Sequence, residues 1–271
     1  MSKKSRPSKQ KKSIAPHSSS IDKYSKIIEN QLIQGDYAEA VANCERLLNF
    51  LPQQAVQRAD VLAKLGTAHG LLQHYHQSFN ILTEALSLDS KNAELWFNRG
   101  MSSLYIIRIG QAFKDFTRAS ELNKRADLAE NLEKALKFSR EMVEQSLQLR
   151  GPGFTLDQLI EQEDLFQRGL KLMRVSKWDE AGQSFQASIA LGDCLPQPWG
   201  NLGLCFLMQE RYDQAEAALK RALVIDPEYT LAQEHLTALP ECRLIGPPEK
   251  IKIQEPFQES KMRRSLLLLK G

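Results

Sequence analysis

The chain has 271 residues, of which 42% are hydrophobic and 25% are charged, which is typical of a soluble globular protein. The sequence contains no run of about 18 apolar residues, so it offers no candidate for a membrane-spanning helix. The net charge of +3 arises at one end, because residues 1–12 hold six basic residues and no acid, which leaves 30 basic against 33 acidic residues elsewhere. A slightly acidic body excludes a general nucleic-acid-binding surface.

Residues 1–20 are rich in Lys, Ser and Pro and nearly free of apolar residues. Such a segment buries too little surface to offset its conformational entropy, so we expect a disordered basic tail. The tail lacks the apolar core of a secretory signal. It could contact RNA, anionic lipid or an acidic protein, or it could serve only as a solubilising end.

Helical periodicity begins near Ile21 and then repeats. Gly66 and Gly100 lie 34 residues apart, and so do Gly169 and Gly203. A fixed period of this length predicts stacked helix–turn–helix repeats. A glycine inside a helix costs about 1 kcal/mol relative to alanine, so its recurrence predicts close packing of the first helix (helix A) on the second (helix B) of each repeat. We align five repeats, which span residues 21–54, 59–92, 93–126, 162–195 and 196–229.

The segment between the third and fourth repeats predicts one amphipathic capping helix over residues 127–149. Gly151–Gly153 should end this helix, and Thr155 with Gln158 resembles a capping box that opens the next helix. Two organisations fit this pattern: two arrays covering residues 21–150 and 151–240, or one continuous superhelix with an irregular middle. We favour two arrays.

The C-terminal part of the chain predicts a second capping helix over residues 230–239. An irregular tail follows over residues 241–271, because four prolines interrupt the pattern from Pro240 onward. The tail ends in a basic stretch and four leucines, Leu266–Leu269. This end could dock on a partner, on a membrane surface or in the chain's own groove.

The fifth repeat carries a family resemblance. It reads P-W-G-N-L-G-L-C-F over residues 198–206, R-Y-D-Q-A over residues 211–215, and L-K-R-A-L-V-I-D-P over residues 219–227. This pattern resembles the tetratricopeptide repeat family. The resemblance implies an all-α fold, a tetratricopeptide-type α-solenoid of helix–turn–helix repeats, here with disordered N- and C-terminal tails. The other repeats depart from the pattern at four positions: Ile28, Arg99, Lys124 and Ser188.

In such a solenoid, helix A of each repeat lines a concave face. Amide side chains there can pair with a peptide backbone, while Met and Phe adapt to apolar side chains. Some of these residues could instead be covered by a neighbouring helix or by the chain's own tail. The candidate peptide-binding groove consists of Lys64, Phe97, Asn98, Met101, Tyr105, Phe166, Gln167, Leu170, Arg174, Asn201, Leu204 and Met208.

The resemblance also allows one partner class to be excluded. Some family members grip a C-terminal carboxylate with Lys and Asn on the first helix A, Asn on the second, and Lys and Arg on the third. The matching positions here hold Ser25 and Glu29, then Lys64, then Glu94 and Asn98. We therefore expect no binding to the acidic chaperone tails that those members recognise.

Nothing in the sequence predicts catalysis, a cofactor or a metal site. Phosphate-loop, nucleophile-elbow and zinc-protease motifs are absent, and the four cysteines lack metal-ligand spacing. Unpaired cysteines favour a reducing, cytoplasmic location. The sequence thus predicts a non-catalytic protein–protein interaction scaffold or adaptor that binds a peptide or helix of a partner in the groove. The alternative is a nucleic-acid or anionic-membrane adaptor that uses the basic tail, whose binding would weaken steeply with salt.

Overall fold

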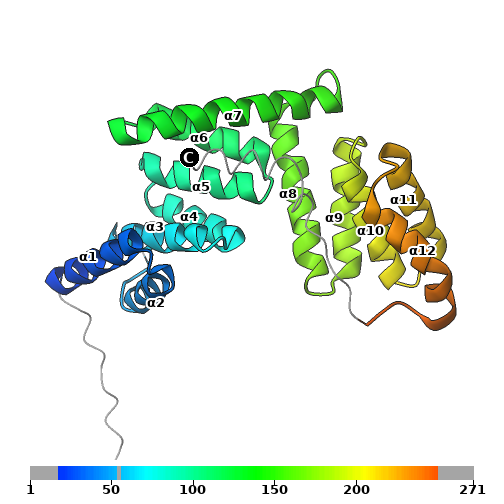
Figure 1. The fold of residues 1–271 in the computed structure, drawn as a ribbon, viewed down its shortest axis with the longest axis horizontal. Coiled ribbons are helices and arrows are strands. Elements are labelled where there is room, and N and C mark those ends of the chain that lie inside the picture. The colour runs from blue at the N-terminus through cyan, green and yellow to red at the C-terminus, as the bar shows by residue number, and fades with distance from the viewer. Residues whose placement is uncertain (1–17, 54–55, 250–271) are drawn as a thin grey trace, which may run out of the picture. The chain divides into compact units, whose positions relative to one another are not determined.

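A computed structural model describes residues 18–53 and 56–249, and all regular secondary structure in those ranges is α-helical (Figure 1). The helices are α1 (Ser18–Gln34), α2 (Tyr37–Leu48), α3 (Val56–Leu71), α4 (Tyr75–Leu88), α5 (Ala93–Tyr105), α6 (Ile109–Leu122), α7 (Ala126–Arg150), α8 (Leu156–Met173), α9 (Trp178–Leu191), α10 (Pro196–Met208), α11 (Tyr212–Ile225) and α12 (Thr230–Ile245). The predicted all-α fold of helix–turn–helix repeats is therefore confirmed for the described residues.

The structure divides into two compact units, residues 1–98 and 99–271, and the division falls within α5. The predicted boundary at Gly151–Gly153 lies instead inside the second unit. The physical reason is that α6 and α8, which flank this break in sequence, pack directly on each other. The Cβ of an alanine at Gly110 of α6 would come within 2.8 Å of Ile160 of α8.

The five predicted repeats correspond to five helical hairpins, and each hairpin turns through one residue in the left-handed region. The next residue's N–H then bonds the carbonyl five positions earlier, as His74 does to His69 at 2.8 Å. This arrangement satisfies carbonyls that the end of helix A leaves unpaired. The left-handed residues are Gly35, Gln73, Ile107, Ser176 and Glu210, with φ between 56° and 87°.

The recurring glycines mark the closest approach of helix A to helix B. A Cβ built on Gly100 would lie 2.6 Å from the Phe116 ring, and one on Gly169 would lie 2.6 Å from the Phe185 ring. Gly66 meets Leu82 and Gly203 meets Leu219 in the same way, at 2.6 and 2.7 Å. The four glycines thus occupy equivalent positions, which we call the glycine seams.

The seams show which residue of helix B approaches each glycine. In every case it is the large apolar residue of the same hairpin that lies against the glycine. Phe116 and Phe185 are fully buried there, because the missing glycine side chain leaves room for a ring.

The third hairpin accommodates Arg99, which replaces the usual leucine, by an ion pair. Arg99 Nε and Nη2 donate to the two carboxylate oxygens of Asp115 at 2.8 and 2.6 Å. Gln111 donates a third bond to Asp115 at 2.7 Å, and the Asp115 side chain is fully buried. Burial raises the pKa of Asp115, and its bond to Arg99 opposes that rise.

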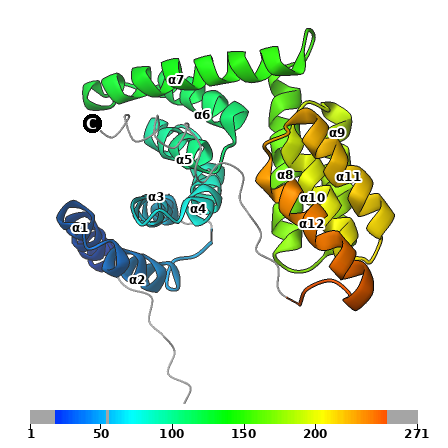
Figure 2. The same cartoon turned by 45° about the vertical axis from the view of Figure 1, so that its right-hand side comes forward.

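The capping helix α7 matches its predicted range to within one residue at each end. It ends at Gly151, whose φ of 92° continues no helix. The predicted capping box is confirmed: the Thr155 hydroxyl accepts from the Gln158 N–H at 3.2 Å, and the Gln158 side chain accepts from the Thr155 N–H at 2.9 Å. Figure 2 shows α7 lying along α6 and ending beside α8.

The C-terminal helix α12 is longer than predicted. We expected it to end at residue 239, but it continues through Pro240 and ends at Gly246, whose φ is 89°. Leu239 and Cys242 are buried on either side of the proline, so packing holds the helix across it. Residues 1–17 of the predicted basic tail and residues 250–271 lie outside the described residues, and α1 begins inside the predicted tail at Ser18.

Candidate functional site

In the first unit, two of the predicted groove residues, Lys64 and Asn98, bond to neighbouring side chains. The Lys64 ammonium lies 2.5 Å from Asp60 and 3.2 Å from Glu29, and the Lys64 side chain is only 11% exposed. Asn98 donates to the Thr67 hydroxyl at 3.2 Å. Phe97 is half-buried on the same helix as Asn98. Lys64 therefore stabilises the packing of α1 on α3, and its charge is already matched within the protein.

In the second unit, three of the predicted groove residues prove to be interior residues. Leu170, Asn201 and Leu204 are each 1% exposed. Asn201 donates its amide to the Gln197 carbonyl at 3.0 Å, within its own helix. The expectation that these three side chains contact a partner has to be corrected, because α8 and α10 are covered on that face by neighbouring helices.

The remaining predicted residues of the second unit are accessible to different degrees. Arg174 is exposed. The others are half-buried: Met101, Tyr105, Phe166, Gln167 and Met208. Phe166 and Met208 pack against the core of the second unit, and the Phe166 ring meets Phe185 edge-on at a centroid distance of 5.5 Å.

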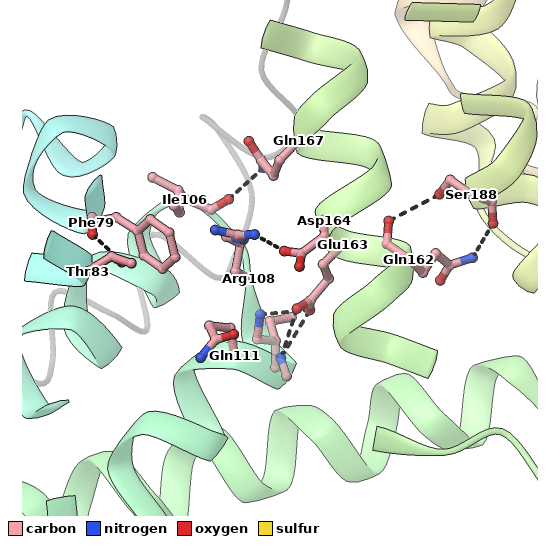
Figure 3. A network of polar contacts seen from close by, with 12 residues as sticks. Phe79, Thr83, Ile106, Arg108, Gln111, Gln162, Glu163, Asp164, Gln167 and Ser188 are labelled. Atoms are coloured by element: carbon pink, nitrogen blue, oxygen red, sulfur yellow. Dashed lines mark hydrogen bonds and ion pairs between the residues drawn. The ribbon is translucent and has the colours of Figure 1, made fainter. Parts of the chain in front are cut away.

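The junction of α6 and α8 holds a polar network that the sequence analysis did not predict (Figure 3). The Glu163 carboxylate of α8 accepts the N–H of Ile109 at 2.7 Å and that of Gly110 at 3.1 Å. It therefore caps the N-terminus of α6, whose own N-cap residue, Arg108, makes no capping bond. Arg108 pairs instead with Asp164, and Gln167 donates to the Ile106 carbonyl at 2.9 Å.

The environment of Glu163 disfavours the ionised form of its carboxyl group. Burial raises the pKa of Glu163 to about 7. Bonds from the backbone N–H groups of Gly110, Ile109 and Gln111 and the nearby Arg108 charge oppose the rise. The pKa nevertheless stays above that of a free glutamate, because removal from water is the larger effect.

Beside this junction lies a cavity of about 270 Å³ within the second unit. We call it the α7–α8 cavity, since these helices supply most of its wall. Its lining includes Ile107, Met142, Leu149, Phe166, Gln167 and Leu195.

Sequence reasoning found only two of these six residues, Phe166 and Gln167. It assigned the helix over residues 127–149 to capping alone. The apolar pair Met142 and Leu149, seven residues apart on one helical face, was the signal that could have revealed this wall. Ile107 gave no signal, because its left-handed conformation follows from the hairpin turn.

The charged groups that line the cavity are paired within the protein. Arg150 donates to Gln162 at 2.6 Å and to the Ser146 carbonyl at 2.8 Å. Gln162 in turn donates to the carbonyls of Ser188 and Gly192 at 2.9 and 2.8 Å. Because these groups satisfy one another, the cavity presents a mainly apolar surface, which suits an apolar side chain.

Within residues 18–53 and 56–249, three or more His, Cys, Asp or Glu side chains nowhere gather as a set of metal ligands. Over the same ranges, none of the helices combines the length and apolarity needed to traverse a bilayer.

One repeat of this chain matches a known protein family, and several known proteins are distantly similar to the chain. The tetratricopeptide repeat family matches residues 196–229. The bovine (Bos taurus) BBSome complex member BBS4 is 24% identical over 245 residues, which cover 76% of this chain and 46% of that protein. The human DnaJ homolog subfamily C member 7 is 23% identical over 217 residues, which cover 73% of this chain and 42% of that protein. This chain spans less than half the length of either relative.

Among solved structures, the TPR domain of P58(IPK) is 14% identical and aligns with a TM-score of 0.45. The alignment covers 83% of this chain and 66% of that domain. The family match is thus confined to residues 196–229, and the close glycine packing at Gly203 of this repeat recurs at Gly66, Gly100 and Gly169.

Proposed function

We propose that the protein is a non-catalytic scaffold or adaptor that binds a peptide or helix of a protein partner on the helix-A side of its repeats. The observation that carries this proposal is the α7–α8 cavity, an apolar space of about 270 Å³ whose wall includes the predicted groove residues Phe166 and Gln167. A space of this size suits one bulky apolar side chain, since a cavity of about 150 Å³ already accepts benzene.

The proposed contact surface is narrower than the sequence alone suggested. It keeps the accessible residues of α5, α8 and α10 and leaves out the interior residues Leu170, Asn201 and Leu204. In the second unit it comprises Met101, Tyr105, Phe166, Gln167, Arg174 and Met208, together with the cavity rim residue Leu149, which is 58% exposed.

In the first unit, Phe97 and Asn98 remain proposed contacts, and Lys64 contributes only through the ion pairs that position α3. The basic-tail alternative concerns residues 1–20, of which residues 1–17 lie outside the described residues. We also propose a reducing compartment such as the cytoplasm, which the four free cysteines support.

The proposal can be tested with two matched surface variants of the full chain. Leu149→Asp places a charge at the cavity rim, and Val175→Asp places the same charge on a side chain of similar exposure, 62%, that does not line the cavity. Proteins retained by each form from the native cell are identified by mass spectrometry, and peptides of each retained protein are titrated by calorimetry.

We expect a retained partner whose peptide binds the wild type and Val175→Asp with a Kd on the order of 1 μM, or about −8 kcal/mol. Leu149→Asp should weaken this binding at least about tenfold, because a carboxylate is costly to bury unpaired. Deleting residues 1–12 should change neither the affinity nor its small salt dependence. Equal binding by both Asp variants would show that the cavity is not the contact site.

A further inference from the structure

The α7–α8 cavity suits an occupant of a particular chemistry. Arg150 and Glu163 are the charged residues among those that line it, and each is already bonded within the protein. Its rim carries the exposed Leu149 and the amides of Gln145 and Gln197. An uncharged aliphatic segment is therefore the matching occupant, with its backbone within reach of amide side chains.

The chain itself contains such a segment beyond its last described residue, Glu249. Residues 266–269 are four consecutive leucines, and no acidic residue follows Glu259. The basic residues Arg263 and Arg264 precede the leucines. The acidic Glu141 is exposed on α7, one helical turn before the rim residue Gln145, and would complement this basic pair.

The length of the intervening chain permits this contact. Residues 250–266 can span up to about 55 Å when extended. The helices from α8 to α12 follow one another in a packed series within the second unit (Figure 1). Four steps between neighbouring axes, at 8–10 Å each, come to at most about 40 Å, and a full length of the 18-residue α8 at right angles, about 27 Å, raises the span to about 48 Å. The leucines can therefore reach the cavity of the same molecule.

We propose that Leu266–Leu269 of the chain's own C-terminal segment dock over the α7–α8 cavity and insert a leucine side chain into it, with Arg263 and Arg264 beside Glu141. The segment then acts as a built-in occupant that a partner peptide has to displace. This contact is intramolecular, so it can be tested without any partner, and its failure leaves the proposed binding function open to its own test.

Disulfide trapping in the full chain tests the contact directly. The trapping variant carries Leu149→Cys at the rim and Leu267→Cys in the segment, with Cys194→Ser to remove a partly exposed thiol. The remaining cysteines are buried, and burial raises the pKa of Cys44 and Cys205 to about 12, which keeps these thiols unreactive. Circular dichroism verifies that each variant is folded.

The matched control moves the rim cysteine to Glu144, an exposed residue of the same helix that lines a different hollow beside α7. Under mild oxidation, we expect the Leu149→Cys form to close an intramolecular disulfide at least about tenfold faster than the Glu144→Cys form, because docking raises the effective concentration of the two thiols. Replacing Leu266, Leu268 and Leu269 by Ser should reduce the rate to that of the control.

Equal rates for the Leu149→Cys and Glu144→Cys forms, or no disulfide in either form, would overturn the proposal. A rate of disulfide formation that the serine replacements leave unchanged would also overturn the proposal, because the leucines would then not direct the contact. A disulfide that joins two molecules, and forms faster at higher protein concentration, would assign the cavity to a second copy and overturn the intramolecular contact.

Discussion

At the scale of single residues, the fold depends on positions where glycine, which has no side chain, lets two helices approach closely. Each glycine seam lets a fully buried Leu or Phe of helix B approach helix A to a distance that a Cβ would block. Helical glycine is intrinsically unfavourable, so the benefit comes from the packing that it allows. The same reasoning separates these glycines from Gly182, whose added Cβ would have its nearest neighbours at an ordinary 3.6 and 3.7 Å.

This difference predicts opposite effects for two identical substitutions. Gly203→Ala should lower the free energy of unfolding by about 1–3 kcal/mol, because its Cβ would meet Leu219 at 2.7 Å and the Ala215 backbone carbonyl at 3.3 Å. Gly182→Ala should leave stability unchanged or raise it by up to about 1 kcal/mol. Urea unfolding of both variants provides the measurement, and a loss of equal size in both would contradict the seam account.

The buried ion pair of the third hairpin gives a second prediction at this scale. Arg99→Leu alone should destabilise the protein by about 3–5 kcal/mol, because it leaves the Asp115 carboxylate buried without its partner. Adding Asp115→Ala recreates the Leu202 and Ala218 pair found at the equivalent positions of the fifth hairpin, and should recover most of the loss. A double-mutant cycle by thermal unfolding measures the coupling, and additive losses would argue against the pair as a unit.

At the scale of elements, α7 interrupts the repeat period, yet the helices on either side of it pack together. Glu163 caps α6 from α8, and Gly110 permits the two helices to approach. Ile107, a β-branched residue with a φ of 60°, sits in the adjoining turn and lines the cavity. A backbone conformation of this kind costs about 1–3 kcal/mol and persists only where the surroundings enforce it, so this junction is a tightly constrained part of the second unit.

The raised pKa of Glu163 predicts a pH dependence of stability. Between about pH 4.5 and 7 the folded protein holds a proton that the unfolded chain has already released, so the stability contributed by Glu163 falls as pH rises through this range. Glu163→Gln cannot titrate and should remove that slope. Urea unfolding from pH 4.5 to 8 measures it.

The control for this experiment is Glu161→Gln, on the exposed face of the same helix, which should keep the wild-type slope. A stability profile of Glu163→Gln parallel to that of the wild type would show that Glu163 is ionised throughout this pH range. Its capping bonds to α6 would then outweigh the cost of its burial.

At the scale of the whole molecule, the chain consists of helical hairpins stabilised mainly by adjacent helices. The hydrophobic clusters follow this order: one joins α1, α2 and α3, and another centres on α8, α9, α10 and α11. In such arrays, stability is approximately a sum of local terms and nearest-neighbour interfaces. Damage to one hairpin should therefore remain local.

Hydrogen exchange can test this locality with one substitution in each unit. Gly66→Ala should speed exchange in α3 and α4 and leave α10 and α11 within about twofold of the wild type, because local openings are set by local packing. Gly203→Ala should produce the reverse pattern. Uniform acceleration along the whole chain in both variants would indicate a single cooperative unit instead.

The sequence by itself determined the hairpins, because their signals are local and periodic. The 34-residue spacing placed Gly66, Gly100, Gly169 and Gly203 at equivalent seams, and Thr155 with Gln158 marked the start of α8. Of the residues that line the α7–α8 cavity, it identified Phe166 and Gln167. It could not show that Leu170, Asn201 and Leu204 are covered, since each depends on which helix packs over it.

Only the tertiary structure decided how α6, α7 and α8 meet. Glu163 caps a helix that begins 54 residues earlier, and the cavity wall combines residues from α7, α8 and the turn at Ile107. No local pattern encodes these contacts, because they depend on helices that are distant in sequence and become neighbours only when the repeats stack. The repeat period thus specifies each hairpin, while the packing between hairpins creates the α7–α8 cavity.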